Sequence, residues 1–250
     1  MTTSSMLAID AGNSRIKWGF WRDGVWAGHG TVASAEAGTL SEAWRSAGIG
    51  PIRVVASNVA GTAVAAAIER AAAAGGMALQ WFRTGVQRGG VTNRYDDPAV
   101  LGTDRWAALI GARARCPAAC VVVNCGTAIT IDALTVDGEF VGGLILPGLN
   151  LMRESLSRGT AQLADIAGEF TLFPRNTADA MASGAVYAAA GAVSGLARRL
   201  FERDGALPHV VLSGGGAPAL APQIEGDVDY VPHLVLEGLV VAVTTDGVLP

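Results

Sequence analysis

The chain has 250 residues, half of them hydrophobic and 16% of them charged, with a formal net charge of −4 at pH 7. This composition predicts a folded globular protein, long enough for one large domain or two small ones. The acidic balance and the absence of any run of Lys or Arg argue against nucleic-acid and anionic-membrane partners. Three cysteines, an odd number in a chain too large to need disulfides, predict a reduced, cytoplasmic setting.

The first half of the chain is predicted to contain three strands followed by alternating helices and strands. An apolar strand at 7–9 precedes an alternating strand at 15–21, and a turn leads to a third strand at 25–29. The later elements are a helix near 40–46, a strand at 52–56, a helix at 63–74, a strand at 78–82, a surface loop at 84–101 and a helix at 104–114.

The second half repeats this order. The predicted elements are strands at 120–123, 128–135 and 140–146, helices at 149–156 and 178–203, a strand at 209–212 and a helix from 236. The repeat predicts two related α/β domains, 1–116 and 117–250, that arose by duplication. The uncharged stretch 180–197 consists mostly of Ala, Gly and Ser between charged residues, which favours a buried helix over a membrane span.

Each half begins with a strand that leads into a similar polar turn. The first is Asp10-Ala-Gly-Asn-Ser and the second is Asn124-Cys-Gly-Thr. Glycine lets the backbone approach a ligand closely, and turn amides with small polar side chains suit phosphate. A third turn, Ser213-Gly-Gly-Gly-Ala217, follows a later strand, although an ordinary strand-to-helix connection has the same composition. The two hairpins together predict a polyphosphate site.

This order of motifs resembles the superfamily that contains actin, Hsp70 chaperones and sugar kinases. The resemblance implies two RNase H-like (actin-like ATPase) domains with mixed sheets and an interdomain cleft that binds ATP. It also implies that the third turn lies against the adenosine.

More specific motifs run from Asp10 to Leu239. They are Asp10-x-Gly-Asn-Ser-x-Ile-Lys17, Tyr95 with Gly102-Thr-Asp-Arg105, Cys125-Gly-Thr-Ala, Gly142-Gly-Leu-Ile-Leu-Pro-Gly148, Thr160-Ala-Gln-Leu163 and Leu234-Val-Leu-Glu-Gly-Leu239. Together they resemble the type III pantothenate kinase family, also called the Bvg accessory factor family. The resemblance implies a homodimeric transferase that uses ATP to convert pantothenate to 4′-phosphopantothenate, the first step of coenzyme A biosynthesis.

The substrate residues follow from the resemblance. Asp104 is expected to be the general base on the primary hydroxyl of pantothenate, while its position also suits the N-terminus of a helix, and the two roles can coexist. Arg105 is expected to hold a carboxylate, or else to form a surface ion pair. Thr177 resembles a threonine that reaches the substrate from the partner subunit. The expected substrate-binding residues are Tyr95, Gly102, Thr103, Asp104, Arg105 and Thr177.

The resemblance also implies a nucleotide site with Mg²⁺, organised by Asp10 through water. Lys17 either contributes to this site or faces solvent from its alternating strand. Asn124 stands where the family usually has an aspartate associated with K⁺ or NH₄⁺. Asparagine keeps an oxygen ligand but loses the charge, so cation affinity should fall. The expected ATP-binding residues are Asp10, Ala11, Gly12, Asn13, Ser14, Arg15, Ile16, Lys17, Gly126, Thr127, Gly214 and Gly215.

Two other functions are compatible with parts of this pattern. A non-catalytic regulatory or accessory protein that retains the kinase fold would explain Asn124, but not the presence of Asp10, Asp104 and Arg105 together. A kinase or phosphatase of the same superfamily that acts on a sugar or polyphosphate leaves Tyr95 and the block 102–105 unexplained.

Overall fold

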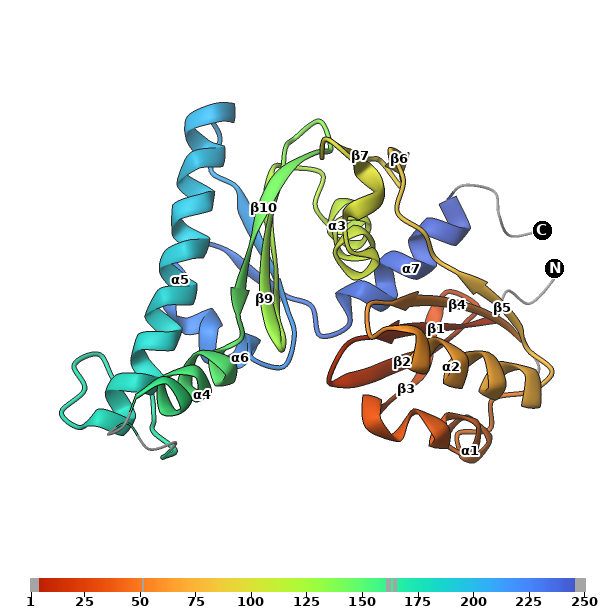
Figure 1. The fold of residues 1–250 in the computed structure, drawn as a ribbon. Helices are drawn as coiled ribbons and strands as arrows, with labels where there is room; N and C mark the ends of the chain where they lie inside the picture. Colours follow the sequence, from red (N-terminus) through yellow and green to blue (C-terminus); the bar gives the residue numbers. More distant parts are fainter. Residues whose placement is uncertain (1–4, 51, 161–162, 164–165, 246–250) are drawn as a thin grey trace. The chain divides into compact units, whose positions relative to one another are not determined.

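Figure 1 shows the computed structural model, which describes residues 5–50, 52–160, 163 and 166–245. Ala161 and Gln162, which belong to the motif that starts at Thr160, lie outside the described residues. Contacts divide the chain into two units, residues up to Ala114 with those from Leu234 onward, and Arg115–His233. The division at residues 116 and 117 into duplicated domains stays a prediction, while the contacts group the last helix with the first unit.

The first unit contains a five-stranded sheet in the order β3-β2-β1-β4-β5. β1 pairs antiparallel with β2 and parallel with β4. Helices α1 and α2 bury Trp44 and Ile68 against one face of this sheet, and α7 packs against β1 and β4 on the other (Figure 1). The elements are β1 (Ser5–Ala11), β2 (Arg15–Arg22), β3 (Val25–Ala33), η1 (Ser34–Thr39), α1 (Leu40–Ser46), β4 (Arg53–Asn58), α2 (Thr62–Ala74), β5 (Ala78–Trp81) and α7 (Leu234–Thr245).

Two glycines let α7 approach helix α3 (Thr103–Arg115) closely. A Cβ atom on Gly238 would lie 1.7 Å from the carbonyl oxygen of Ala107, and one on Gly111 would lie 2.7 Å from that of Leu234. No side chain can be accommodated at such distances from a backbone atom. This crossing gives the glycine of the motif 234–239 a packing role.

The stretch 84–101 is more ordered than the loop expected from its composition. It contains the antiparallel pair β6 (Gln87–Arg88) and β7 (Val91–Asn93), followed by the turn η2 (Pro98–Val100). Gly89 and Gly90 both have positive φ, at 56° and 76°, which a tight hairpin turn requires and glycine tolerates. The Thr84 hydroxyl donates to the carbonyl of Leu101 at 2.9 Å and closes the base of the segment.

The second unit repeats the topology of the first. Its strands follow the order β12-β11-β8-β9-β10, and β8 pairs antiparallel with β9 and parallel with β11, as β1 does with β2 and β4. This correspondence confirms the expected fold class of two mixed sheets with the same strand arrangement. The elements are β8 (Cys120–Cys125), β9 (Ala128–Leu134), β10 (Glu139–Pro147), α4 (Leu149–Gly159), α5 (Thr177–Asp204), β11 (His209–Ser213), α6 (Ala217–Leu220), η3 (Ala221–Gln223) and β12 (Val228–Tyr230).

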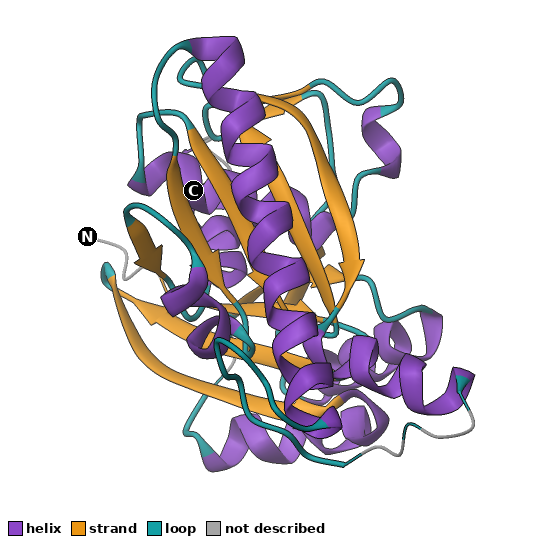
Figure 2. Cartoon of the chain, turned by 90° about the vertical axis from the view of Figure 1, so that its left-hand side faces the viewer, coloured by secondary structure: helices purple, strands orange, loops and turns teal. Residues whose placement is uncertain are grey.

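Helix α5 crosses one face of this sheet and packs beside α4 (Figure 2). By length and composition alone α5 could span a membrane, but the core helix of a globular protein passes the same test. Val186, Ala189 and Val193 are buried against Val121 and Ile129 of the sheet. These contacts favour the buried-helix interpretation.

Candidate active site

The turn between β1 and β2 is held from outside by one serine. The Gly12 amide donates to the carbonyl of Arg15 at 3.1 Å, which closes the turn. The Ser34 hydroxyl donates to the Gly12 carbonyl at 2.6 Å, and the Ser34 amide donates to that of Ser14 at 3.0 Å. Asn13 and Ser14 are exposed in this braced turn, whereas the expected ATP-binding residues Ala11 and Ile16 are buried in the core and Arg15 is exposed.

Asp10 and Lys17 lie opposite each other in the β1–β2 ladder, and both are half-buried. Burial raises the pKa of Asp10 to about 7, and the nearby Asp104 carboxylate adds to this rise while Lys17 opposes it. Lys17 is the only lysine in the chain. Its half-buried place beside Asp10 favours a role in the site over the alternative of a solvent-facing side chain.

Asp104 belongs to the first turn of α3, and its carboxylate is half-buried. Burial raises the pKa of Asp104, while the Arg105 amide, which donates to Oδ1 at 2.8 Å, and the Arg105 guanidinium oppose the rise. A Cβ atom on Gly102 would lie 2.6 Å from the same Oδ1. Glycine at position 102 therefore leaves the room that the Asp104 carboxylate occupies.

Arg105 is buried, with 7% of its surface exposed, so it is not a surface ion pair. Its Nη1 donates to the Tyr95 hydroxyl at 3.0 Å, and its guanidinium carbon lies 5.6 Å from the centre of the Tyr95 ring. Asn93, which the sequence analysis missed, holds this tyrosine in place. Its Oδ1 accepts from the Tyr95 amide at 3.1 Å, and its Nδ2 donates to the Pro98 carbonyl at 3.2 Å. The signal for Asn93 was an amide side chain at the end of a short strand.

Ser57 is a second residue that the sequence analysis missed. It is completely buried near the end of β4, where it faces Asp10 in the parallel β1–β4 register. Its hydroxyl lies 2.8 Å from Oγ1 of Thr103, the first residue of α3. In the sequence, the polar residue Ser57 near the end of an apolar strand is the feature that could have identified it. Hydrogen bonds, strand pairing or electrostatic interactions within the first unit thus connect Asp10, Lys17, Ser57, Thr103, Asp104, Arg105 and Tyr95.

In the second unit, three glycine-containing turns meet at the β8–β9 connection. The Gly148 amide donates to the Thr127 carbonyl, and the Gly216 amide donates to the Cys125 carbonyl, both at 2.9 Å. A Cβ atom on Gly148 would lie 2.3 Å from the Gly126 carbonyl oxygen. The structure therefore gathers Gly126, Thr127 and the turn 214–216, all of which the sequence assigned to the nucleotide.

The remaining expected residues of this unit have different surroundings. Gly214 is buried with φ +96° against Cys125, so packing alone requires glycine there, whereas Gly215 is exposed. Asn124 is half-buried and pairs with Thr130 of β9 and Ser213 of β11.

Thr177 begins helix α5 and is exposed. Asn176 caps this helix by accepting from the Asp179 amide at 2.9 Å.

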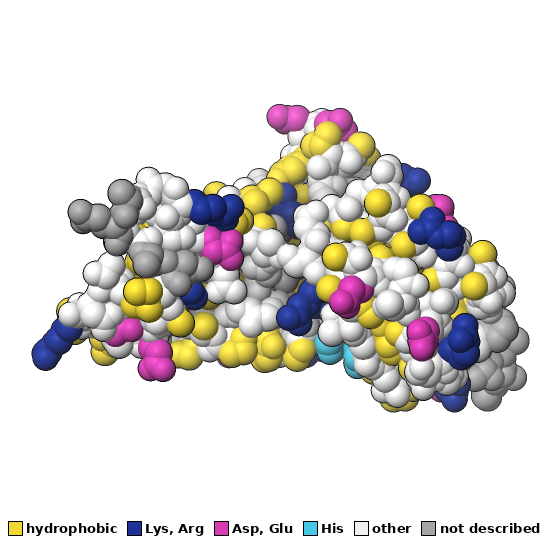
Figure 3. All heavy atoms as spheres, turned by 60° about the horizontal axis from the view of Figure 1, so that its bottom comes forward, with side chains coloured by type: hydrophobic (Ala, Val, Ile, Leu, Met, Phe, Trp, Pro, Cys, Tyr) yellow, Lys and Arg dark blue, Asp and Glu magenta, His cyan; other side chains and the backbone are white. Residues whose placement is uncertain are grey.

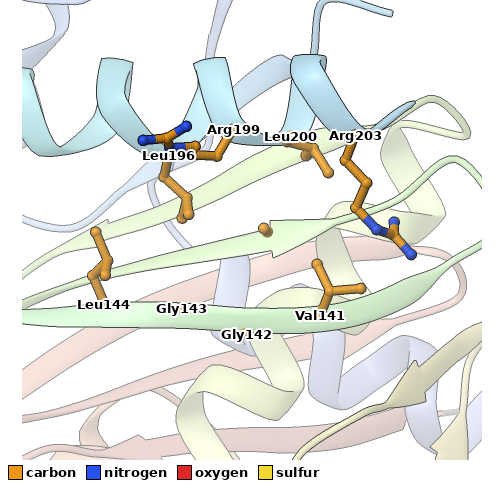
Figure 4. A pocket seen from close by; sticks show the side chains of 9 residues that line it. Val141, Gly142, Gly143, Leu144, Leu196, Arg199, Leu200 and Arg203 are labelled. Atoms are coloured by element: carbon orange, nitrogen blue, oxygen red, sulfur yellow. The ribbon is translucent and has the colours of Figure 1, made fainter. Parts of the chain in front are cut away.

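A pocket of about 290 Å³ lies between β10 and the C-terminal half of α5 (Figure 4). None of the expected site residues line it, and its two arginines bind carboxylates, Arg199 with Glu202 at 2.8 Å and Arg203 with Asp204 at 2.9 Å. On the face shown in Figure 3, the Lys and Arg side chains are separated by neutral and acidic residues. Neither this pocket nor this face competes with the residues around Asp104 as the candidate site.

Comparisons with known proteins identify the family of the chain. The family model for type III pantothenate kinases matches residues 6–199. Type III pantothenate kinases of Aromatoleum aromaticum and Janthinobacterium sp. are 48% and 46% identical, over 97% and 94% of this chain and 99% and 95% of their own.

Solved structures share the fold at lower identity. A protein of Campylobacter jejuni assigned to the Baf family of transcriptional activators has a TM-score of 0.61 at 21% identity, over 97% of this chain and 100% of its own. A protein of Sinorhizobium meliloti assigned as a 2-dehydro-3-deoxygalactonokinase has a TM-score of 0.60 at 15% identity, over 98% and 99%. At these identities the likeness shows the fold alone. The family model and the curated relatives show that the chain belongs to the type III pantothenate kinase family.

Proposed function

We propose that Asp104 is the general base of this kinase. Membership of the family makes the chain an enzyme that phosphorylates pantothenate with ATP to 4′-phosphopantothenate, the first step of coenzyme A biosynthesis. The observation that carries the proposal is the half-buried Asp104 carboxylate at the start of α3, next to a buried Arg105. The comparisons give no support to the non-catalytic alternative.

The chemical step needs a group that accepts one proton. The primary hydroxyl oxygen of pantothenate forms a bond to the γ-phosphorus of ATP, the bond to the bridging oxygen breaks, and ADP leaves. The hydroxyl proton passes to the Asp104 carboxylate. Burial raises the pKa of Asp104, and a carboxylate with a raised pKa is a stronger base once it is ionised.

Arg105 is proposed to bind the carboxylate of pantothenate. A buried guanidinium offers several N–H donors in a planar fork that matches a carboxylate, and charge-assisted bonds of this kind are strong. The hydrogen bond to Tyr95 orients the fork, and Asn93 orients Tyr95 through its backbone amide.

Asp10 is proposed to organise Mg²⁺ through water, with Asn13, Ser14 and Lys17 on the phosphates of ATP. The pKa of Asp10 is near 7 because burial and Asp104 destabilise its negatively charged form. A divalent cation, which prefers oxygen ligands, would stabilise that charge. When bound, the cation neutralises charge on the phosphate oxygens.

In the second unit, we propose that Gly126 and Thr127 bind phosphate and that the exposed Gly215 contacts the adenosine.

Asn124 is proposed to weaken or abolish activation by K⁺ or NH₄⁺, because its amide oxygen carries no net charge. The test is turnover with and without K⁺ in the wild type and in Asn124→Asp, which restores the carboxylate. We expect the variant to gain K⁺ dependence. Wild-type activity that rises steeply from zero with K⁺ would contradict the proposal.

We propose a cytoplasmic homodimer in which Thr177 reaches the substrate of the partner. Leu172 and Phe173, close to Thr177 in sequence, are 64% and 87% exposed. They are held outward because the Thr171 amide donates to the Ser183 hydroxyl at 2.9 Å and the Tyr187 hydroxyl donates to the Leu172 carbonyl at 3.2 Å. A second copy of the chain would cover these apolar side chains.

Subunit mixing tests this arrangement. Asp104→Asn and Thr177→Val are each expected to lose activity, but a mixed dimer contains one site with both residues intact. A refolded equal mixture should then recover about a quarter of the wild-type turnover, since half of the dimers are mixed and each has one active site. No recovery from a mixture that forms dimers would place Thr177 in the site of its own chain.

The general base itself is tested by a pantothenate-dependent ADP-release assay with Mg²⁺ and ATP. Asp104→Asn should fold normally and lose roughly 10²–10⁴-fold in turnover, the usual contribution of a general base. Near-wild-type turnover in this variant would leave Asp104 only its role at the start of the helix.

A further inference from the structure

Ser57 ties the start of α3 to the central sheet of the first unit. Its side chain has no exposed surface, and a buried hydroxyl is costly unless it is hydrogen-bonded. Its hydrogen bond joins it to the Thr103 hydroxyl at 2.8 Å, across 46 positions of sequence. Thr103 directly precedes Asp104, so this bond acts on the turn of helix that carries the carboxylate.

The same serine lies beside the second carboxylate of the site. In the parallel register of β1 and β4, Ser57 is the partner of Asp10. The Asp104 carboxylate is close enough to Asp10 to interact with it electrostatically. Ser57 is thus connected to Asp10 through strand pairing and to Asp104 through the hydrogen bond to the neighbouring Thr103.

We propose that Ser57 is a positioning residue for Asp104, acting through its buried hydrogen bond to Thr103. The inference rests on the proposed role of Asp104 as the base. The first turn of a helix has no intrahelical partners for its amides and depends on contacts outside the helix to stay ordered. Gly102 provides no side chain that could hold this turn, whereas the Ser57–Thr103 hydrogen bond links the turn to β4.

The effect is expected on turnover rather than on binding. Misplacement of a reacting group by about 1 Å can lower a rate about 10²-fold. Arg105 and Tyr95 would still hold pantothenate, because their mutual bond does not involve Ser57. Loss of the Ser57 hydroxyl should therefore lower kcat while KM for pantothenate changes little.

The experiment compares Ser57→Ala, Thr103→Val, their double variant and Thr103→Ser in the ADP-release assay. Ser57→Ala is expected to lower kcat about 10- to 100-fold, with KM for pantothenate within about threefold of the wild type. Thr103→Ser keeps the hydroxyl and should have a higher kcat than Thr103→Val, which loses it. The double variant should be no slower than the slower single variant, because both remove the same bond.

Thr135→Val is the matched control. It removes a buried hydroxyl that accepts from the Glu139 amide at 3.0 Å in the β9–β10 turn, at the opposite end of β9 from Gly126 and Thr127. Its kcat should equal that of the wild type, and its melting temperature shows what the loss of one buried hydrogen bond costs in stability. If Ser57→Ala fails to fold, Thr103→Val compared with Thr103→Ser decides the question alone.

The outcomes separate this inference from the proposed base. If Ser57→Ala keeps kcat within twofold while Asp104→Asn loses turnover, the positioning role is wrong and the base stands. Multiplicative losses in the double variant, or Thr103→Ser as slow as Thr103→Val, would also overturn it. If Asp104→Asn itself keeps wild-type turnover, the proposed base fails whatever Ser57 does.

Discussion

Replacement of Asp10 by Asn should change how the stability of the protein depends on pH. In the folded protein the pKa of Asp10 is raised from the ordinary value of 3.8 to about 7, mainly by burial and then by Asp104. Between these two values the folded state keeps a proton that the unfolded state releases, so the wild type loses stability as pH rises. This difference between the folded and unfolded pKa values lowers the free energy of unfolding by roughly 4 kcal/mol once the pH exceeds both of them.

Asp10→Asn removes the ionisation and keeps the size of the side chain. We expect the variant to match the wild type near pH 4 and to be more stable by about 2–4 kcal/mol near pH 8 in the absence of Mg²⁺ and ATP. The free energy of unfolding would be measured by urea titration, followed by tryptophan fluorescence, at intervals across this range. Saturating Mg²⁺ and ATP should reduce the difference.

A stability difference between Asp10→Asn and the wild type that stays constant across the pH range would refute the reasoning. It would mean that Asp10 ionises as easily in the folded protein as in the unfolded chain. A difference that shrinks as pH rises would also refute it, because the sign of the pKa change would then be opposite.

Three further substitutions test other features. Gly102→Ala places a Cβ against Oδ1 of Asp104 and should lower kcat about 10- to 100-fold at nearly unchanged melting temperature, whereas unchanged kcat would show that the carboxylate tolerates displacement. Arg105→Lys loses the planar fork and should raise KM for pantothenate about tenfold; an unchanged KM would remove Arg105 from the substrate site. Gly238→Ala, whose Cβ would meet the Ala107 carbonyl, should destabilise the protein by about 3 kcal/mol in urea titration. Its control is Gly191→Ala, a helical glycine in open space, which should be slightly stabilising; equal stability of the two variants would contradict the close α3–α7 crossing.

The sequence by itself determined the order of the longer strands and helices in both units, but not the short strands β6, β7 and β12. Strands such as β2 and β9 are recognisable because side-chain alternation is a local property with a period of two residues. The polar turns at Gly12 and Gly126 follow from glycine and small polar residues directly after a buried strand. The family resemblance rested on the same local motifs, and the comparisons confirmed it.

Only the tertiary structure decided which distant segments meet. Nothing in the sequence of α7 indicates where the helix packs. Its close approach to α3 depends on Gly111 and Gly238, which lie far apart along the chain. The hairpin at 87–93 also escaped prediction, because its strands are too short to show a period.

The residues that support the candidate site were also identified only from the tertiary structure. Ser57 and Asn93 act through hydrogen bonds to Thr103 and Tyr95, and neither has a motif of its own. The place of Lys17 beside Asp10 required the register of β1 and β2. Local patterns report the propensity of a segment, whereas burial and hydrogen-bond partners depend on long-range packing. The sequence could therefore indicate candidate site residues, and only the structure showed which side chains form hydrogen bonds with them.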